Sequence, residues 1–271
     1  MVHLSLTGHR PKELFGYDLS APEYTSIRKR LAKLISYFVE KEGEVVGHTG
    51  MALGADTLYA LTLLEAKKHF PGKVKLHAEI PHPTQSAKWP REEDRLRYNY
   101  IMNNADDSTL YNDEYTPWCL QKRNEGMLDH GDHLIAIWDG TIKPKSGTSN
   151  AIKYSIKRGS GYYVLRPNDN LVRYDLPNAS LLKKTGHAPF TRESIEEVIA
   201  ARLETERALG SEVKVNVKSY LFRAADGRLS LLELKKEVIT PSFEIWTLKD
   251  YTERGGVFIN TENSTFIKKL N

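Results

Sequence analysis

The sequence predicts an α/β fold with a doubly wound, mostly parallel sheet, followed by a small α+β domain. Short apolar runs alternate with longer amphipathic runs through residue 166, a pattern typical of parallel strands joined by helices. The run at 132–138, DHLIAIW, is strongly apolar, as expected of a strand that is buried on both faces. Beyond residue 178, strand-like runs flank an Ala-Asp-Gly hairpin signal, which indicates a separate and smaller unit.

The elements of the first part follow from these runs. We expect strands at 2–6, 44–47, 73–80, 108–111, 132–138 and 161–166, and helices at 22–41, 58–70, 90–104, 117–130 and 148–157. The first helix has its apolar side chains on one face, at Ile27, Leu31, Leu34, Ile35 and Phe38. Right-handed crossovers would bring the carboxyl ends of all these strands, and the loops that follow them, to one edge of the sheet.

The second part is less regular. The period is lost at 167–189, which we interpret as a linker or an extended arm. A helix is expected from Thr191 to about Gly210, then strands at 213–223, 228–239, 243–248, 257–259 and 265–267. We therefore place a first domain at 1–177 and a second at 178–271. The second has no clustered acid, base or nucleophile, so its role is not predicted.

The stretch GHTGMALGAD, residues 47–56, is the strongest functional signal. It lies between an apolar strand and an amphipathic helix, and Gly50 and Gly54 allow positive φ and close approach of a ligand. We expect the amides of residues 53–56 to be unpaired at the helix N-terminus, where an anion such as phosphate is favoured. Its candidate ligand-binding residues are Gly50, Met51, Leu53 and Gly54. The alternative is a tight turn that holds nothing.

Other loops at the same predicted edge contain side chains or glycines suited to a ligand. An arginine such as Arg10 can bind phosphate, a tryptophan can stack on a base, and small residues at a helix start leave amides free. These candidates are Thr7, Gly8, Arg10, Gln85, Trp89, Asp139, Gly140, Ser146, Gly147 and Thr148. Each has a purely structural alternative, but ligands in such sheets bind at this edge. Together they predict one shared pocket.

Composition excludes several function classes. The chain is 40% hydrophobic and 27% charged, and no apolar run approaches the length needed to span a membrane. The N-terminus lacks the pattern of a signal peptide, and Cys119 is the single cysteine. We therefore expect a cytoplasmic protein. Nine histidines show no metal-binding spacing, so we predict no metal and no cofactor. The net charge of +4 suits a small anion as well as nucleic acid.

Six motifs in order resemble the YpsA-like branch of the SLOG superfamily, the group that includes DprA and the LOG phosphoribohydrolases. They are TGHRP, GMALGAD, IPHPTQSAKWP, RNEGMLD, a strand ending WDG, and SGT before a helix. The resemblance covers residues 1 to about 166. It implies a Rossmann-like domain with a pocket for nucleotides or their derivatives, in a group that includes N-glycosidic hydrolases, DNA-processing proteins and ligand sensors.

The resemblance fails at one catalytic position. LOG-type hydrolases carry a glutamate in a G-T-x-x-E motif, whereas Gly147-Thr148 is followed at that place by Ala151, whose methyl group cannot act as base or nucleophile. The arginine of those enzymes is matched by Arg123, with Asn124 beside it. The acid that remains in the motifs is Asp56, which could assist hydrolysis, bind a ribose hydroxyl or cap the helix. Asp56 and Arg123 are thus the candidate catalytic residues.

Three functions remain open. The first is a sensor or scavenger that binds a nucleotide-derived small molecule, such as an ADP-ribose-like or cyclic-nucleotide signal, without turning it over. The second is a nucleoside-monophosphate N-glycosidase or phosphoribohydrolase that uses Asp56 and Arg123. The third is a DprA-like nucleic-acid binder, which the even charge distribution disfavours. We rank them in this order, and we leave a homo-oligomer open.

Overall fold

The computed structural model describes residues 1–158, 162–168, 172–175, 218–223, 229–240, 243–254 and 257–269. Its contacts divide the chain into two compact units. The first comprises Met1–Ser155 and Tyr162–Arg173, and the second comprises Ile156–Gly161 and Tyr174–Asn271. The domain boundary proposed at 177/178 lies in the range 176–217, outside the described residues.

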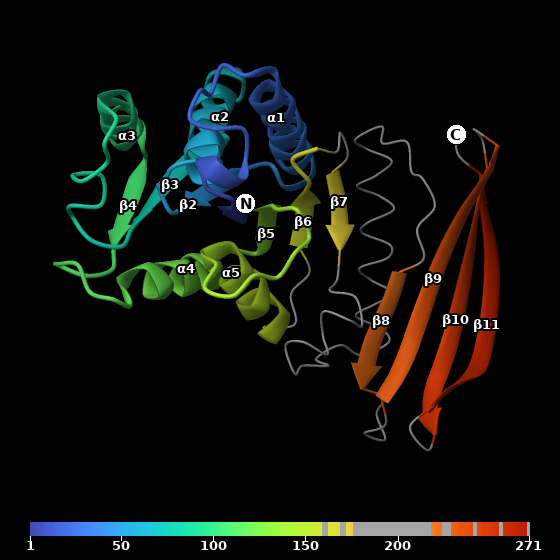
Figure 1. Ribbon diagram of the computed structural model, residues 1–271. Coiled ribbons are helices and arrows are strands. Elements are labelled where there is room, and N and C mark those ends of the chain that lie inside the picture. The colour runs from blue at the N-terminus through green and yellow to red at the C-terminus, as the bar shows by residue number, and fades with distance from the viewer. Residues whose placement is uncertain are drawn as a thin grey trace. The chain divides into compact units, whose positions relative to one another are not determined.

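The first unit is built on a parallel sheet, as the alternation of runs predicts (Figure 1). Its strands are β1 (Val2–Gly8), β2 (Val45–Thr49), β3 (Val74–Ile80), β4 (Asp107–Leu110), β5 (His133–Ile137) and β6 (Tyr162–Leu165). They lie in the order β4-β3-β2-β1-β5-β6, and each neighbouring pair is parallel. The predicted Rossmann-like α/β class is confirmed.

Helices cover both faces of this sheet (Figure 1). They are α1 (Pro22–Glu42), α2 (Ala55–His69), α3 (Glu92–Asn104), α4 (Cys119–His130) and α5 (Gly147–Lys157). The first three lie on one side, and α4 and α5 lie on the other. The apolar face predicted for α1 is buried, since Ile27, Leu31, Leu34 and Ile35 are fully enclosed. Burial of such side chains from both layers provides the main stabilisation of the unit.

The order of the strands reverses between β1 and β5. From β1 the chain adds β2, β3 and β4 on one side, then returns to place β5 and β6 on the other. Gly8, at the carboxyl end of β1, is paired with Ile137, at the carboxyl end of β5. In open parallel sheets such a reversal leaves a crevice outside the strand ends, where ligands bind.

The segment predicted as a linker or arm contains a strand. β7 (Val172–Asp175) forms the edge of the sheet beyond β6, giving seven strands in all. Its sequence, VRYD, is short and carries no alternation long enough to distinguish a strand from an extended arm. Pairing with the sheet, rather than local preference, therefore determines its structure.

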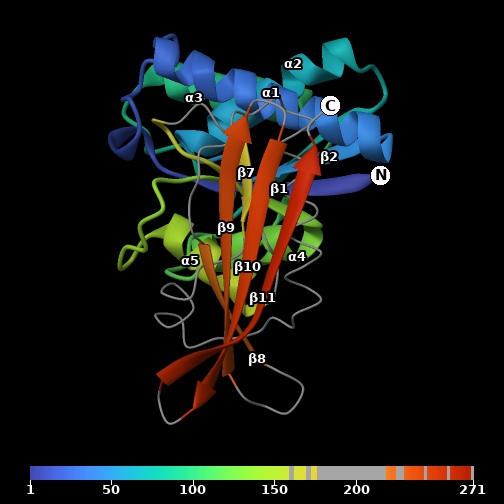
Figure 2. The same cartoon turned by 90° about the vertical axis from the view of Figure 1, so that its right-hand side faces the viewer.

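The strands described from residue 218 onward form an antiparallel sheet in the order β11-β10-β9-β8 (Figure 2). Its strands are β8 (Lys218–Arg223), β9 (Leu229–Thr240), β10 (Phe243–Arg254) and β11 (Val257–Lys269). The predicted hairpin pairing is confirmed, because Arg223 is paired with Leu229. The two short strands predicted at 257–259 and 265–267 are one continuous strand, β11. The helix predicted from Thr191 lies outside the described residues.

Across the described residues, we find no helix that is both long enough and apolar enough to cross a membrane.

Candidate functional site

A cavity of about 410 Å³ opens at the carboxyl ends of the strands, beside the reversal between β1 and β5. It draws residues from the end of β1, the Gly-rich turn before α2, helix α4 and the loop that leads into α5. Nine of the predicted site residues line it: Thr7, Gly8, Arg10, Asp56, Arg123, Asn124, Ser146, Gly147 and Thr148. Segments up to 140 residues apart in sequence thus meet at one edge, joined by the Thr148 hydroxyl, which donates to the Gly8 carbonyl at 2.8 Å.

The Gly-rich turn does not use its glycines as expected. Positive φ occurs at Met51 (56°) and Gly54 (96°), and Gly50 is not among the positive-φ residues. A Cβ on Gly50 would instead collide with the guanidinium of Arg123, and one on Gly54 would lie 2.6 Å from the His9 carbonyl oxygen. Gly50 is therefore required by the close approach of a side chain from α4. Neither glycine lines the cavity, and the same holds for Met51 and Leu53.

The backbone amides at the start of α2 are partly used within the protein. We expected all four amides of residues 53–56 to be free, but the amide of Ala55 donates to the His9 carbonyl at 3.1 Å. This bond and the contact at Gly54 attach the turn to the loop after β1. The N-terminus of α2 is therefore a weaker anion site than the sequence indicates.

Asp56 lies in the first turn of α2 and is 8% exposed. Its Oδ2 accepts from the Ala52 amide at 3.2 Å, and its backbone carbonyl accepts from the Thr49 hydroxyl at 3.1 Å. Burial raises the pKa of this carboxyl, while the charges of Arg123 and Arg10 oppose the rise. Asp56 thus stabilises the turn and also presents a carboxyl with an elevated pKa to the cavity.

Arg123 is the cation buried beside Asp56. It comes from the middle of α4 and is 3% exposed. Its Nη1 donates to the Gly50 carbonyl and lies 3.9 Å from Asp56 Oδ2, while its Nε, among the described atoms, has no hydrogen-bond partner. Because Arg123 also lines the cavity, its guanidinium can attract a negatively charged ligand there.

Two predicted residues of the loop after β3 lie outside the cavity. Gln85 donates its side-chain amide to the carbonyls of Gly50 and Met51, at 3.1 Å each, so it supports the Gly-rich turn. The Trp89 ring packs edge-on against Tyr98 of α3, with ring centroids 5.5 Å apart. This is the helix-packing alternative that its sequence position also allows.

Asp139 and Gly140 also lie outside the cavity, in the loop after β5. The carboxylate of Asp139 lies 3.4 Å from His9 Nε2 and 3.1 Å from Lys143 Nζ. Lys143 additionally approaches Glu13 at 3.5 Å. These pairs join the loop after β1 to the loop before α5. Asp139 therefore holds the wall of the cavity together, and Gly140 allows the turn through its φ of 91°.

The loop before α5 provides the other wall. Ser146, Gly147 and Thr148 line the cavity, and no described group accepts a hydrogen bond from the amides of Gly147 and Thr148. Because these amides begin an α-helix, they favour a negative charge in front of them. The sequence predicts free amides at the start of both α2 and α5. At α2 the Ala55 amide is already bonded within the protein, whereas at α5 these two amides are available to a ligand.

Sequence reasoning missed several residues that line the cavity. They include two cations from the loop TIKPKSG, Lys143 and Lys145, and one carboxylate, Glu13. The cavity is therefore lined by four cationic side chains and by two carboxylates, Asp56 and Glu13. The further lining residues are Leu6, Ala52, Leu120, Met127 and Pro144. The two lysines could have been found from the sequence, because they lie in the segment directly before Ser146, Gly147 and Thr148, which are predicted site residues. The apolar residues carried none, because core residues have the same composition.

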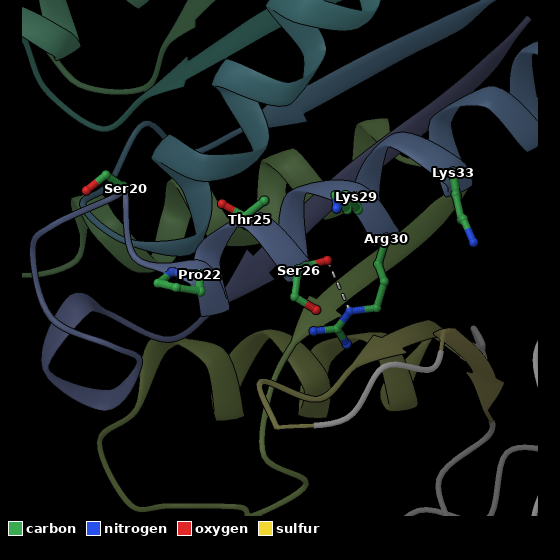
Figure 3. Close-up of a pocket in the computed structure, with 7 residues that line it drawn as sticks. All are labelled: Ser20, Pro22, Thr25, Ser26, Lys29, Arg30 and Lys33. Carbon is green, nitrogen blue, oxygen red and sulfur yellow. Dashed lines mark hydrogen bonds between the residues drawn. The ribbon is translucent and has the colours of Figure 1, made fainter.

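A second cavity, of about 590 Å³, lies along the first turns of α1 (Figure 3). Lys29, Arg30 and Lys33 line it, with small polar residues. Arg30 points back to the protein, where its Nη1 donates to the Arg166 carbonyl at 2.9 Å. Although this cavity is larger, it contains none of the predicted site residues. We take the smaller cavity as the candidate site.

A polar layer separates α4 from the sheet. Glu79 of β3 is fully buried there, and its carboxylate accepts hydrogen bonds from His48, His130 and Tyr111 at 2.8, 3.0 and 2.8 Å. Burial alone would raise the pKa of Glu79, but these bonds lower it to about 2. The carboxylate is therefore ionised at neutral pH, next to the helix that carries Arg123.

The model of the YpsA family, described as the YspA SLOG family, matches residues 4–170, which is more than half of the chain. The chain belongs to this family. The predicted resemblance is thereby confirmed, and the matched range contains β2 to β6, most of β1 and every residue that lines the cavity.

Relatives of this YpsA-type chain match somewhat more than half of it. The prophage-derived protein YoqJ of Bacillus subtilis is 28% identical over 157 residues, which is 54% of this chain and 89% of YoqJ. A UPF0398 protein of Bacillus thuringiensis is 27% identical over 173 residues, which is 61% of this chain and 91% of that protein. Both matches therefore span nearly the whole length of the relatives.

Among solved structures, DNA processing protein A from Helicobacter pylori is similar, with a TM-score of 0.42 and 15% identity. The alignment covers 75% of this chain and 81% of that one. Single-stranded DNA binding is described for that protein. A likeness at this level carries no functional argument for the YpsA-type chain.

Proposed function

We propose that the cavity at the strand ends binds a nucleotide or nucleotide-derived anion, as a sensor or scavenger. The observation that carries the proposal is the convergence of Arg10, Arg123 and the free amides at the start of α5 on one cavity. Guanidinium groups and helix-terminal amides are the two kinds of donor that proteins most often place around phosphate. The volume is within the range of small-molecule sites.

The lining also supports binding over turnover. Ala151, at the place of the LOG glutamate, is 1% exposed and does not line the cavity. The carboxyl nearest to Arg123 is Asp56, and one of its oxygens already accepts from the Ala52 amide. A glycosidic hydrolase needs a carboxyl that is available to the anomeric centre. The cavity therefore has groups that can bind a ligand, but its carboxyl beside Arg123 is partly committed to the protein itself, which favours binding without hydrolysis.

Hydrolysis of an N-glycosidic bond is the second candidate. It is favoured by the raised pKa of Asp56, because a buried carboxyl that stays protonated nearer to neutral pH can donate a proton to a leaving base. Arg123 would then hold the phosphate or stabilise the negative charge. A nucleic-acid binder remains the third candidate, and the even distribution of charge along the chain disfavours it.

Arg10→Ala tests the binding proposal directly. Arg10 is exposed and lines the cavity, so its loss should weaken the binding of a phosphorylated ligand by about 1.5–3 kcal/mol and leave the fold intact. The ligand is first selected from nucleoside monophosphates, cyclic nucleotides and ADP-ribose by its effect on the melting temperature. At about one hundred times its dissociation constant, a ligand should stabilise the protein by roughly 2.7 kcal/mol. Calorimetry then compares wild type with the variant.

Lys29→Ala is the matched control, because it removes a cation from the second cavity on α1 (Figure 3). The affinity of this variant for the selected ligand should equal that of the wild type. Equal losses in Arg10→Ala and Lys29→Ala would indicate general attraction by positive charge, and no loss in Arg10→Ala would place the ligand elsewhere.

Asp56→Asn separates binding from hydrolysis. The asparagine oxygen can still accept from the Ala52 amide, so the turn and the fold should persist, while loss of the negative charge beside the buried Arg123 should lower the melting temperature. We expect no free base from wild type or variant when each selected nucleotide is incubated and analysed by chromatography. Base release by the wild type that is lost in Asp56→Asn would contradict the binding proposal and support the hydrolase.

A further inference from the structure

Three side chains from separate elements converge beneath α4. They are His48 in β2, Glu79 in β3 and His130 at the last position of α4. The strands bring the first two together, because β2 and β3 are parallel neighbours, with His48 paired to His77 and Glu79 two residues further along β3. Helix α4 then places His130 over them. The donor atoms of the three side chains all lie within 4.8 Å of one another.

The geometry of this group differs from an ordinary histidine–carboxylate pair. Nδ1 of His48 and Nδ1 of His130 both point to the same oxygen, Oε1 of Glu79, at 2.8 and 3.0 Å. A third imidazole nitrogen, Nε2 of His77, lies 3.9 Å from that oxygen. Three nitrogens therefore surround one carboxylate oxygen, in a space that is nearly the size of a metal coordination sphere.

The surroundings orient these groups as an outer shell does around a metal. Nε2 of His48 lies 2.8 Å from Nδ1 of His3, which fixes the ring, and the Tyr111 hydroxyl donates to the other Glu79 oxygen at 2.8 Å. Outer-shell partners of this kind hold ligating histidines and carboxylates in place. Glu79 and His48 are buried, while the His130 side chain is 45% exposed. His130 therefore provides the path from solvent.

We propose that His48, Glu79 and His130 bind a zinc-class divalent ion, with His77 available as a fourth ligand. Two imidazoles and a carboxylate are ligands that Zn²⁺ accepts at about 2.0–2.2 Å. The ligand atoms need to separate by a few tenths of an ångström to admit the ion. With Nδ1 on the ion, neutral His48 and His130 each carry the proton on Nε2. Nε2–H of His48 then donates to Nδ1 of His3, which carries its own proton on Nε2. His77 would exchange its contact with Thr109, now 2.8 Å, for the metal.

The sequence could not indicate this site. Its ligands are 31 and 51 residues apart, on two strands and a helix, whereas a recognisable zinc pattern has two ligands within one turn or loop. The predicted absence of a metal rested on that local spacing. The proposal is independent of the ligand cavity, so failure of nucleotides to bind would not affect it.

The test uses the full chain without an affinity tag, dialysed against a chelator and titrated with Zn²⁺ in competition with a chromophoric chelator. We expect one Zn²⁺ per chain and a rise in melting temperature on binding. His130→Ala should bind about a hundredfold more weakly or worse, since even outer-shell changes cost 10- to 100-fold. The variant should fold, because His130 is partly exposed at the end of a helix.

His69→Ala is the matched control. His69 is an exposed histidine 3.5 Å from Glu65, at the end of α2, and no third ligand among the described residues converges on it. It should bind Zn²⁺ as the wild type does. Co²⁺ provides a measurement that needs no variant, because a protein site of low coordination number gives intense visible absorption bands and adventitious surface binding gives weak ones. Equal Zn²⁺ affinity of His130→Ala and wild type, or only weak Co²⁺ bands, would overturn the proposal.

Discussion

Replacing Arg123 with methionine should lower the free energy of unfolding by about 3–5 kcal/mol, the usual cost of removing one member of a buried ion pair. Methionine fills much of the same volume but leaves the Asp56 carboxylate buried without its closest cation, 3.9 Å away. It also removes the donor to the Gly50 carbonyl, on which the Gly-rich turn depends. The variant should therefore lose both stability and ligand binding.

This loss should depend on pH in a defined direction. Burial already raises the pKa of Asp56 in the folded protein, and Arg123 opposes that rise, so its removal raises the pKa further. A carboxyl with a raised folded-state pKa binds more protons in the folded than in the unfolded state. The Asp56 carboxyl thus destabilises the folded protein at high pH, and this effect disappears as the pH falls through the pKa of Asp56 in the folded state. Denaturant unfolding at about pH 8 and about pH 5.5 should show the larger deficit at the higher pH.

Lys122→Met provides the comparison for Arg123→Met. Lys122 precedes Arg123 on α4, is exposed, and donates to the Tyr111 carbonyl at 2.9 Å. Loss of this surface contact should cost about 1 kcal/mol or less, with little change between the two pH values. If Arg123→Met were no less stable than Lys122→Met, Arg123 would be a ligand-binding group without a structural role.

The first unit was predictable from sequence because its signals are local. The alternating runs place all six strands and five helices within a few residues of their observed bounds, and the apolar face of α1 follows directly from helical spacing. The sequence does not predict β7, because its four residues show no clear period and form a strand only by pairing with the sheet. β11 was divided into two strands because the polar residues TENST interrupt its apolar pattern.

The candidate site was predictable only in outline. Loops at the strand ends meet because parallel strands share a direction, so Arg10, Asp56, Arg123 and Thr148 could be assigned to one place before the structure was known. Sequence cannot distinguish lining residues from those that support them. Gln85 and Asp139 are polar and lie in the same loops, yet their hydrogen bonds and ion pairs go to the protein itself. Long-range groupings such as His48, Glu79 and His130 are not visible at all.

Ala151→Glu restores the acid of the LOG motif, and we expect it to destabilise the protein by about 3–5 kcal/mol without creating activity. Ala151 is 1% exposed within α5 and does not line the cavity. A carboxylate there would be buried without a prepared cation, which costs several kcal/mol. Protonation relieves that cost, so the deficit should shrink at about pH 5. Denaturant unfolding followed by tryptophan fluorescence measures it, since Trp138 is buried next to β5.

Asn150→Glu is the control for the Ala151 substitution. Asn150 is half-buried at the same end of α5, and its side chain donates to Gln121 at 3.3 Å. A negative charge near a helix N-terminus is favourable by about 0.3–1 kcal/mol, which should offset most of the lost hydrogen bond. The two variants add the same charge one residue apart, so a difference between them reports burial. Wild-type stability of Ala151→Glu, together with release of free base from a nucleotide, would show that position 151 faces the ligand and that its alanine alone separates this chain from the hydrolases.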